Sequence, residues 1–168
     1  MTYEIRTFGD PVLKSRATPV KEFDESLQRL AEDMMRIMRE NEGAGLAANQ
    51  IGRLKRIFVA AYEDDGEVHE FAIVNPVIEE RSETSERELE GCLSIPQIPV
   101  EVERSHAVTV SGQDPTGAPV RVEAEGRLAR IFQHEIDHLD GVLILDRTDR
   151  ESRKAAMREI RERMLARQ

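Results

Sequence analysis

The segment QHEIDHLDG, residues 133–141, constrains the fold of this chain more than any other stretch. It carries two of the four histidines, four positions apart, with a glutamate between them. From Arg127 to Leu139, apolar residues recur around most of a helix circumference, and Gly141 follows as a stop signal. A helix that is apolar on most sides belongs in the interior. We therefore expect the rest of the chain to enclose a buried helix that bears polar groups.

The two histidines are spaced to bind one metal ion. Positions i and i+4 lie one above the other on a helix, about 6 Å apart along its axis, so His134 and His138 can turn toward the same point. Glu135 is next to the first histidine without competing for the ion. The alternative is that both histidines form hydrogen bonds inside a buried helix. We favour the metal site because the H-E-x-x-H pattern rarely arises by chance in a chain with four histidines.

Two imidazoles leave the site incomplete, because zinc-type centres use at least three protein ligands. The longer metalloprotease pattern needs a third histidine where this chain has Ile144, and the downstream glutamates lie on a helix face that looks solvated. His69 and His106 fall in a turn and in an alternating strand. The single cysteine, Cys92, is the most distinctive candidate, because a thiolate binds the ions that imidazole also favours. Its alternative role is an inert buried thiol.

The remaining segments predict an α+β fold in a single domain, residues 1–168: antiparallel β-sheets packed around the buried helix, with an N-terminal helix and a C-terminal amphipathic helix. Asp24 caps a helix that begins at Glu25, and a capping-box spacing from Thr148 to Glu151 opens the last helix. The predicted strands form two hairpins, 56–62 with 70–80 and 100–110 with 119–125.

The charge of the chain bears on its partners. A net charge of -9 argues against broad binding to DNA or to anionic membranes, which would be repelled. The first 25 residues contain no apolar run of signal-peptide length, so we expect a cytoplasmic protein. Residues 147–168 differ from the rest, with seven Arg and one Lys against one Asp and three Glu. This local excess indicates either a solvated face or a surface that docks on the ribosome.

Three stretches together suggest a family. GAGLAANQIG (43–52), EGCLS (90–94) and QHEIDHLDG (133–141) occur in this order and resemble the three signature motifs of the peptide deformylases. GDPVLKSRATPV (9–20) is similar to their N-terminal segment. The resemblance covers most of the chain up to about residue 145. It implies a mixed α+β fold and a metal held by Cys92, His134 and His138. The implied activity is removal of the formyl group from the N-terminal methionine of newly made chains.

The resemblance also implies roles for further residues. Glu135 would act as general base and then return its proton to the leaving nitrogen, while the Gln50 side chain and the Leu93 backbone N–H would stabilise the oxyanion. The expected substrate-binding residues are Ala44, Gly45, Glu90 and Gly91. Glycines suit that role because a backbone without side chains lets an extended peptide approach.

The resemblance implies one divalent ion per chain. We expect Fe(2+) in the cell, with Zn(2+), Ni(2+) or Co(2+) in purified protein. The expected partners are N-formylmethionyl nascent peptides and, through the last helix, the ribosome. Two alternatives stay open on the residues alone: a metallopeptidase of H-E-x-x-H type that cleaves internal bonds, and a noncatalytic metal-binding domain. Arg127 and Arg130 lie one to two turns before the histidines and border the methionine pocket or face solvent.

Overall fold

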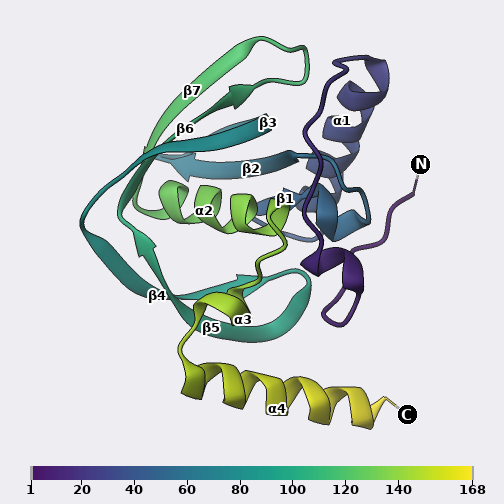
Figure 1. Cartoon of the computed structure of the whole chain (residues 1–168), viewed down its shortest axis with the longest axis vertical. Helices are drawn as coiled ribbons and strands as arrows, with labels where there is room; N and C mark the ends of the chain where they lie inside the picture. Colours follow the sequence, from purple (N-terminus) through teal and green to yellow (C-terminus); the bar gives the residue numbers. More distant parts are fainter. Residues whose placement is uncertain (1, 168) are drawn as a thin grey trace.

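The computed structural model describes residues 2–167 and has the predicted α+β architecture (Figure 1). The helical elements are η1 Pro11–Lys14, α1 Glu25–Glu40, η2 Ala48–Ile51, α2 Arg127–Leu139, α3 Ile144–Arg147 and α4 Arg150–Ala166. The strands are β1 Gly45–Ala47, β2 Ile57–Asp64, β3 Glu67–Arg81, β4 Ser85–Cys92, β5 Ile95–Ser105, β6 Ala107–Gln113 and β7 Pro119–Glu125.

Within this range the strands form two antiparallel sheets on either side of α2. The larger sheet has the order β1-β2-β3-β6-β7, and the smaller one pairs β4 with β5. Figure 1 shows α2 between the two sheets, and α2 contacts strands of both. Helix α1 packs on β1 and β2, whereas α4 packs on β5 at the far end of the molecule. The expected enclosure of the 127–139 helix is confirmed.

One predicted hairpin is confirmed and the other needs correction. Strands β2 and β3 pair from Ile57 opposite Val74 to the turn at Asp65 and Gly66. The predicted strand 100–110 is wrong as one element, because β5 ends at Ser105 and β6 begins beyond His106 in the other sheet. Val100, Val102 and Arg104 before the break and Val108 and Val110 after it are all buried at even-numbered positions, so the apolar and polar pattern of the sequence did not reveal the change of sheet.

The sequence predicts part of β5 in the smaller sheet but not its partner β4. Strand β4 has the sequence SERELEGC, which contains few β-branched or aromatic residues, and most of it is exposed. Its pairing with β5 therefore depends on tertiary context rather than on local preference. This matters for the site because β4 ends at Cys92.

The helix termini follow capping chemistry. The Asp24 carboxylate accepts a hydrogen bond from the Leu27 N–H at 3.1 Å, as expected for the start of α1. Helix α4 is capped one residue later than predicted: Asp149, not Thr148, accepts from the Ser152 N–H at 2.8 Å. Gly141 ends α2 with a φ of 75°, and an added Cβ there would lie 2.6 Å from a backbone oxygen.

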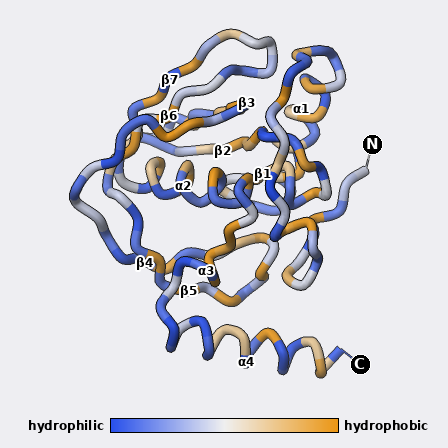
Figure 2. Tube along the Cα trace, viewed as in Figure 1, coloured by the Kyte–Doolittle hydropathy of each residue, from blue (hydrophilic) through white to orange (hydrophobic). Residues whose placement is uncertain are grey.

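The interior position of α2 explains its mixed composition. Figure 2 shows hydrophobic and hydrophilic segments alternating along α2, although the helix is enclosed. Its apolar residues join a core cluster with strands β2, β3, β6 and β7, and Phe132 is completely buried there. Five polar residues of α2 are also buried: Gln133, His134, Glu135, Asp137 and His138. Burying polar groups is costly unless they bond a partner or an ion. The five buried polar residues of α2 are therefore the first place to look for a functional site. None of the helices in residues 2–167 is long and apolar enough to cross a membrane.

Candidate metal centre and cleft

The structure brings together the three residues that the sequence selected as metal ligands. His134 and His138 come from one face of α2, and Cys92 comes from the end of β4. Their ligand atoms all lie within 4.8 Å of one another. The two Nε2 atoms are 3.1 Å apart, and the Cys92 Sγ lies 3.3 Å from the His138 Nε2. A sulfur and two imidazole nitrogens at this spacing fit a divalent transition-metal ion.

The outer nitrogens of the imidazoles support this fit. The His134 Nδ1 lies 2.9 Å from the Glu90 carboxylate, so Nε2 is the ring nitrogen that faces His138 and Cys92. Burial lowers the pKa of His138 below its ordinary value, and this favours the neutral form that a ligand must have. The His138 Nδ1 is buried and has no hydrogen-bond partner among the residues described.

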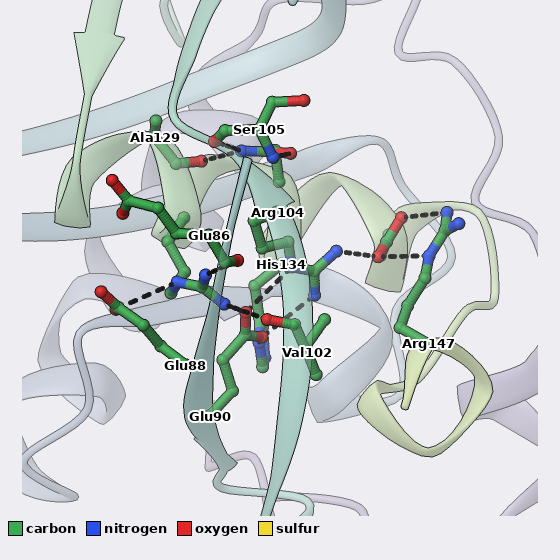
Figure 3. Close-up of polar contacts among 12 residues, drawn as sticks. Glu86, Glu88, Glu90, Val102, Arg104, Ser105, Ala129, His134 and Arg147 are labelled. Atoms are coloured by element: carbon green, nitrogen blue, oxygen red, sulfur yellow. Dashed lines mark hydrogen bonds and ion pairs between the residues drawn. The ribbon is translucent and has the colours of Figure 1, made fainter. Parts of the chain in front are cut away.

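Glu90 is itself held by arginines (Figure 3). The Arg104 guanidinium donates to both of its oxygens, at 2.9 and 3.0 Å, and Arg130 donates to one of them. Burial by itself would raise the pKa of Glu90, but the hydrogen bonds from His134 and Arg104 outweigh it and lower the pKa to about 2. The carboxylate that orients His134 is therefore charged at neutral pH.

Arg104 extends this network away from the cleft. It also bonds Asp137 on α2, and the guanidinium of Arg147 donates to the same carboxylate at 2.9 and 3.0 Å. These partners are not predicted from the sequence motifs. One signal was available: Arg104 continues the inward-facing positions of Val100 and Val102, where a charged residue needs a buried partner.

Glu135 lies beside the imidazoles in a nearly closed environment. Its side chain is 5% exposed, and one carboxylate oxygen lies 4.0 Å from the His134 Nε2. Burial raises the pKa of Glu135 to about 7. Its Oε1 is buried without a hydrogen-bond partner in the described part of the chain. A carboxyl group of this kind can take up and release a proton near neutral pH.

Gln50 is fixed on the other side of the same space. Its Oε1 accepts from the Ala47 N–H at 3.0 Å, so its Nε2 points the opposite way. That nitrogen lies 3.1 Å from the Ser94 Oγ and 3.6 Å from the Cys92 Sγ. Leu93 occupies the turn between Cys92 and Ser94, next to this amide. The two expected oxyanion donors thus lie near the candidate ligands.

A cleft of roughly 770 Å³ opens onto these groups. Of the ten site residues expected from the sequence, nine line it; His138 does not and is 1% exposed. Gly45 lies against the Glu135 carboxylate, and a Cβ at that position would be 2.4 Å from the Oε2 atom. A side chain at Gly45 would therefore have to displace the Glu135 carboxylate, whereas a Cβ at Gly91 would meet nothing within 4 Å.

Comparisons with known proteins show which family the chain resembles. The family model described as polypeptide deformylase matches residues 2–154. Peptide deformylase 1 of Corynebacterium glutamicum is 51% identical over 161 residues, which covers 94% of each chain. The crystal structure of peptide deformylase from Thermotoga maritima superposes with a TM-score of 0.83 at 48% identity, covering 89% of this chain and 99% of that one. The peptide deformylase structure from Thermus thermophilus gives a TM-score of 0.88 at 44% identity, covering 98% of this chain and 96% of that one.

Proposed function

The chain belongs to the polypeptide deformylase family, and on that basis we propose which of its residues carry out the reaction. The protein is a hydrolase that removes the formyl group from the N-terminal formylmethionine of polypeptides and releases formate. The family match favours this activity over the two alternatives, a metallopeptidase and a noncatalytic metal-binding domain. The observation that supports the residue assignment best is the convergence of Cys92, His134 and His138 beside Glu135 in one cleft.

Cys92, His134 and His138 are the proposed ligands of a single metal ion. When bound, such an ion supplies Lewis acidity, which makes water a better nucleophile near neutral pH and polarises a carbonyl oxygen. Glu90 holds the His134 ring from its Nδ1 side, as is usual for a ligating histidine.

Glu135 is the proposed general base and acid. One carboxylate oxygen takes a proton from the attacking water, and the same carboxyl group then returns it to the departing amine nitrogen of methionine. Its raised pKa, about 7, suits a group that must both accept and donate a proton near neutrality.

Gln50 and Leu93 are the proposed donors to the oxyanion that forms at the formyl carbon. The Ala47 N–H fixes the Gln50 amide so that its Nε2 faces the Cys92 side of the cleft, before any substrate arrives. Donors that are already oriented in a buried site need no reorganisation during the reaction. Gln50 is 1% exposed and uncharged, so it acts without adding an ionic group to the site.

The proposed substrate-binding residues lie on two sides of the cleft. Ala44 and Gly45 are on the β1 side, and Glu90 and Gly91 are on the β4 side. An extended formyl-peptide between them can use backbone hydrogen bonds of the flanking strands.

Two substitutions test the site assignment together. Glu135→Ala should retain the metal while turnover falls by about 10² to 10⁴, the usual worth of a general base. Cys92→Ala should lose metal affinity, because it removes a ligand atom. Metal content measured by elemental analysis and formate release from a formyl-Met peptide give the two readouts. Near-normal turnover in Glu135→Ala would refute the assigned role.

We propose Fe(2+) as the ion in the cell; Zn(2+), Ni(2+) or Co(2+) can replace it in protein purified in air, because a site with one thiolate and two imidazoles accepts each of them. Elemental analysis of protein purified without oxygen tests this. Iron at one equivalent per chain is the expected result, and zinc at one equivalent would contradict it. We also propose that the chain works as one catalytic domain in the cytoplasm, where nascent formylated chains are its substrates.

Helix α4 supports a further partner proposal, docking on the ribosome. Lys154, Arg158 and Arg161 are exposed and follow helical spacing along one face. Within residues 2–167 their side chains form no ion pair, in contrast to Arg163, which bonds Glu159. A face of unpaired cations suits a polyanionic surface such as ribosomal RNA.

Replacing these three residues by Gln should weaken co-sedimentation with ribosomes and reduce its salt dependence, while formate release from a free peptide stays the same. A variant that neutralises Arg29 and Arg36 on α1, where arginines are already paired with acids, serves as the control. Equal co-sedimentation of wild type and the triple variant would refute docking through α4.

A further inference from the structure

Arg130 makes an unusual set of contacts for a residue that borders the cleft. It lies on α2 one turn before His134, lines the cleft, and its side chain is only 11% exposed. The sequence left open whether it borders the pocket or faces solvent, and the structure places it against two strands. Its guanidinium donates to the backbone oxygens of Glu86 and Val102, at 2.8 and 2.9 Å. Both acceptor residues are labelled in Figure 3.

The same guanidinium also bonds two carboxylates of β4. Its Nε lies 3.4 Å from a Glu88 oxygen, and one terminal nitrogen bonds Glu90. Four acceptors on β4 and β5 thus share the five N–H donors of one arginine. The planar guanidinium is suited to such fixed, multiple bonding, whereas an ammonium group is not.

These contacts join α2 to strand β4, which lines one side of the cleft. Strand β4 pairs with β5 along one edge, and its other edge has no strand partner in the described part of the chain. Residues 88–92 of this strand all line the cleft, as do residues 43–45. Besides the β5 ladder and the bond between His134 and Glu90, the contacts of Arg130 tie residues 86–90 to α2.

We propose that Arg130 is a positioning residue that sets the width of the cleft between β4 and α2, and thereby its selectivity for the first side chain of the peptide. The inference rests on the proposed function of the cleft as the formyl-peptide site. Because its donors are already engaged by Glu86, Glu88, Glu90 and Val102, Arg130 presents no free cation to the substrate. A wall neutralised in this way accommodates an apolar methionine side chain, which an unpaired guanidinium would disfavour.

Three variants test the role. Arg130→Met keeps an unbranched stem but removes every donor, and Arg130→Lys keeps the charge without the planar fork. Arg121→Met is the matched control: Arg121 is paired with Glu79 and Glu123 on the large sheet and does not line the cleft. Steady-state kinetics with formyl-Met and formyl-Ala peptides give KM, kcat and the preference for methionine. Hydrogen exchange of the backbone amides of residues 86–92 reports on the strand itself.

For Arg130→Met we expect KM for the formyl-Met peptide to rise about tenfold while kcat changes less than about threefold. We expect the preference for methionine over alanine to fall about tenfold, within the range that pocket contacts provide. Exchange at residues 86–92 should become faster, and metal content should stay the same. Arg130→Lys should fall between wild type and Arg130→Met, and Arg121→Met should match wild type.

Unchanged KM and unchanged preference in a folded Arg130→Met protein would overturn the inference. A fall in kcat alone, with loss of metal, would overturn it as well, because it would make the residue only a support for His134. If Arg130→Met does not fold, the same measurements are made on Arg130→Lys, and unchanged KM with unchanged preference for methionine would overturn the inference. Failure of the site assignment is recognised separately, since Glu135→Ala would then retain its activity.

Discussion

The contact between Gly45 and Glu135 allows the proposed mechanism to be tested by adding a single methyl group. A Cβ at position 45 would lie 2.4 Å from the Glu135 Oε2 and 2.8 Å from its carboxyl carbon. Ordinary contact begins near 3.4 Å, so the carboxylate must retreat by about 1 Å. The backbone cannot retreat instead, because Gly45 is paired opposite Ala60 in β1 and β2 and α2 packs directly on β1.

Displacement of a catalytic group by about 1 Å commonly costs about 10² in rate. We therefore expect Gly45→Ala to lower kcat about 10²-fold, equivalent to about 2.7 kcal/mol of transition-state stabilisation. The metal content should not change, since the atoms nearest to the added methyl group all belong to Glu135 and not to a proposed ligand. Formate release from a formyl-Met peptide at saturating concentration measures the effect, and elemental analysis gives the metal content.

A double-mutant cycle separates displacement of Glu135 from interference with the peptide. In a Glu135→Ala background the added methyl group meets no carboxylate, so Gly45→Ala should cause no further loss of kcat. Glu135→Asp shortens the side chain and should reduce the penalty of the methyl group. If Gly45→Ala costs the same factor in every background, the methyl group acts on the substrate, and the assigned contact with Glu135 is not the cause.

Two further predictions concern stability. Phe132 is fully buried with its ring centroid 5.5 Å from that of Phe58 and 5.4 Å from that of Phe71, so Phe132→Ala should lower the free energy of unfolding by about 3–5 kcal/mol. Urea denaturation measures this, and a loss under about 1 kcal/mol would contradict the packing. The Leu27 N–H and the Ser26 hydroxyl lower the pKa of Asp24 below its ordinary value of 3.8, so its contribution to stability is complete above that value and is lost as the pH falls through the lowered pKa. Below about pH 4 the Tm of wild type should therefore fall more steeply with pH than the Tm of Asp24→Asn, which caps the helix without titrating. Equal dependence of the two Tm values on pH would refute this.

The sequence predicted the parts of the fold that depend on local patterns. The helix around QHEIDHLDG, the Asp24 cap and the β2–β3 hairpin each follow from periodicity or turn chemistry, which act over a few residues. Strand β4 could not be found in this way, because its mostly exposed, charged sequence pairs with β5 only in the context of the whole fold. The change of sheet at His106 was hidden because the valines before it and those after it, Val100, Val102, Val108 and Val110, all fall on even-numbered positions.

In the candidate site, too, local patterns predicted some residues, whereas others depend on the whole fold. His134, Glu135 and His138 are evident from spacing on one helix, and Cys92 could be selected because few other ligands were available. The partners of the ligands could not be predicted, since Arg104 reaches Glu90 from 14 residues away and Asp137 from 33. Such pairs depend on strand register and on helix placement. A charged residue at an inward-facing strand position was the one local sign of them.

The proposed ligands come from different layers of the molecule. Sulfur is contributed by the end of the small β4–β5 sheet and both nitrogens by the helix that packs on the large sheet. An ion held by all three would cross-link the two halves of the core, so its affinity and the cohesion of those halves are thermodynamically linked. Chelation should therefore loosen the architecture as well as stop the chemistry, and it should do so first where β4 meets the helix.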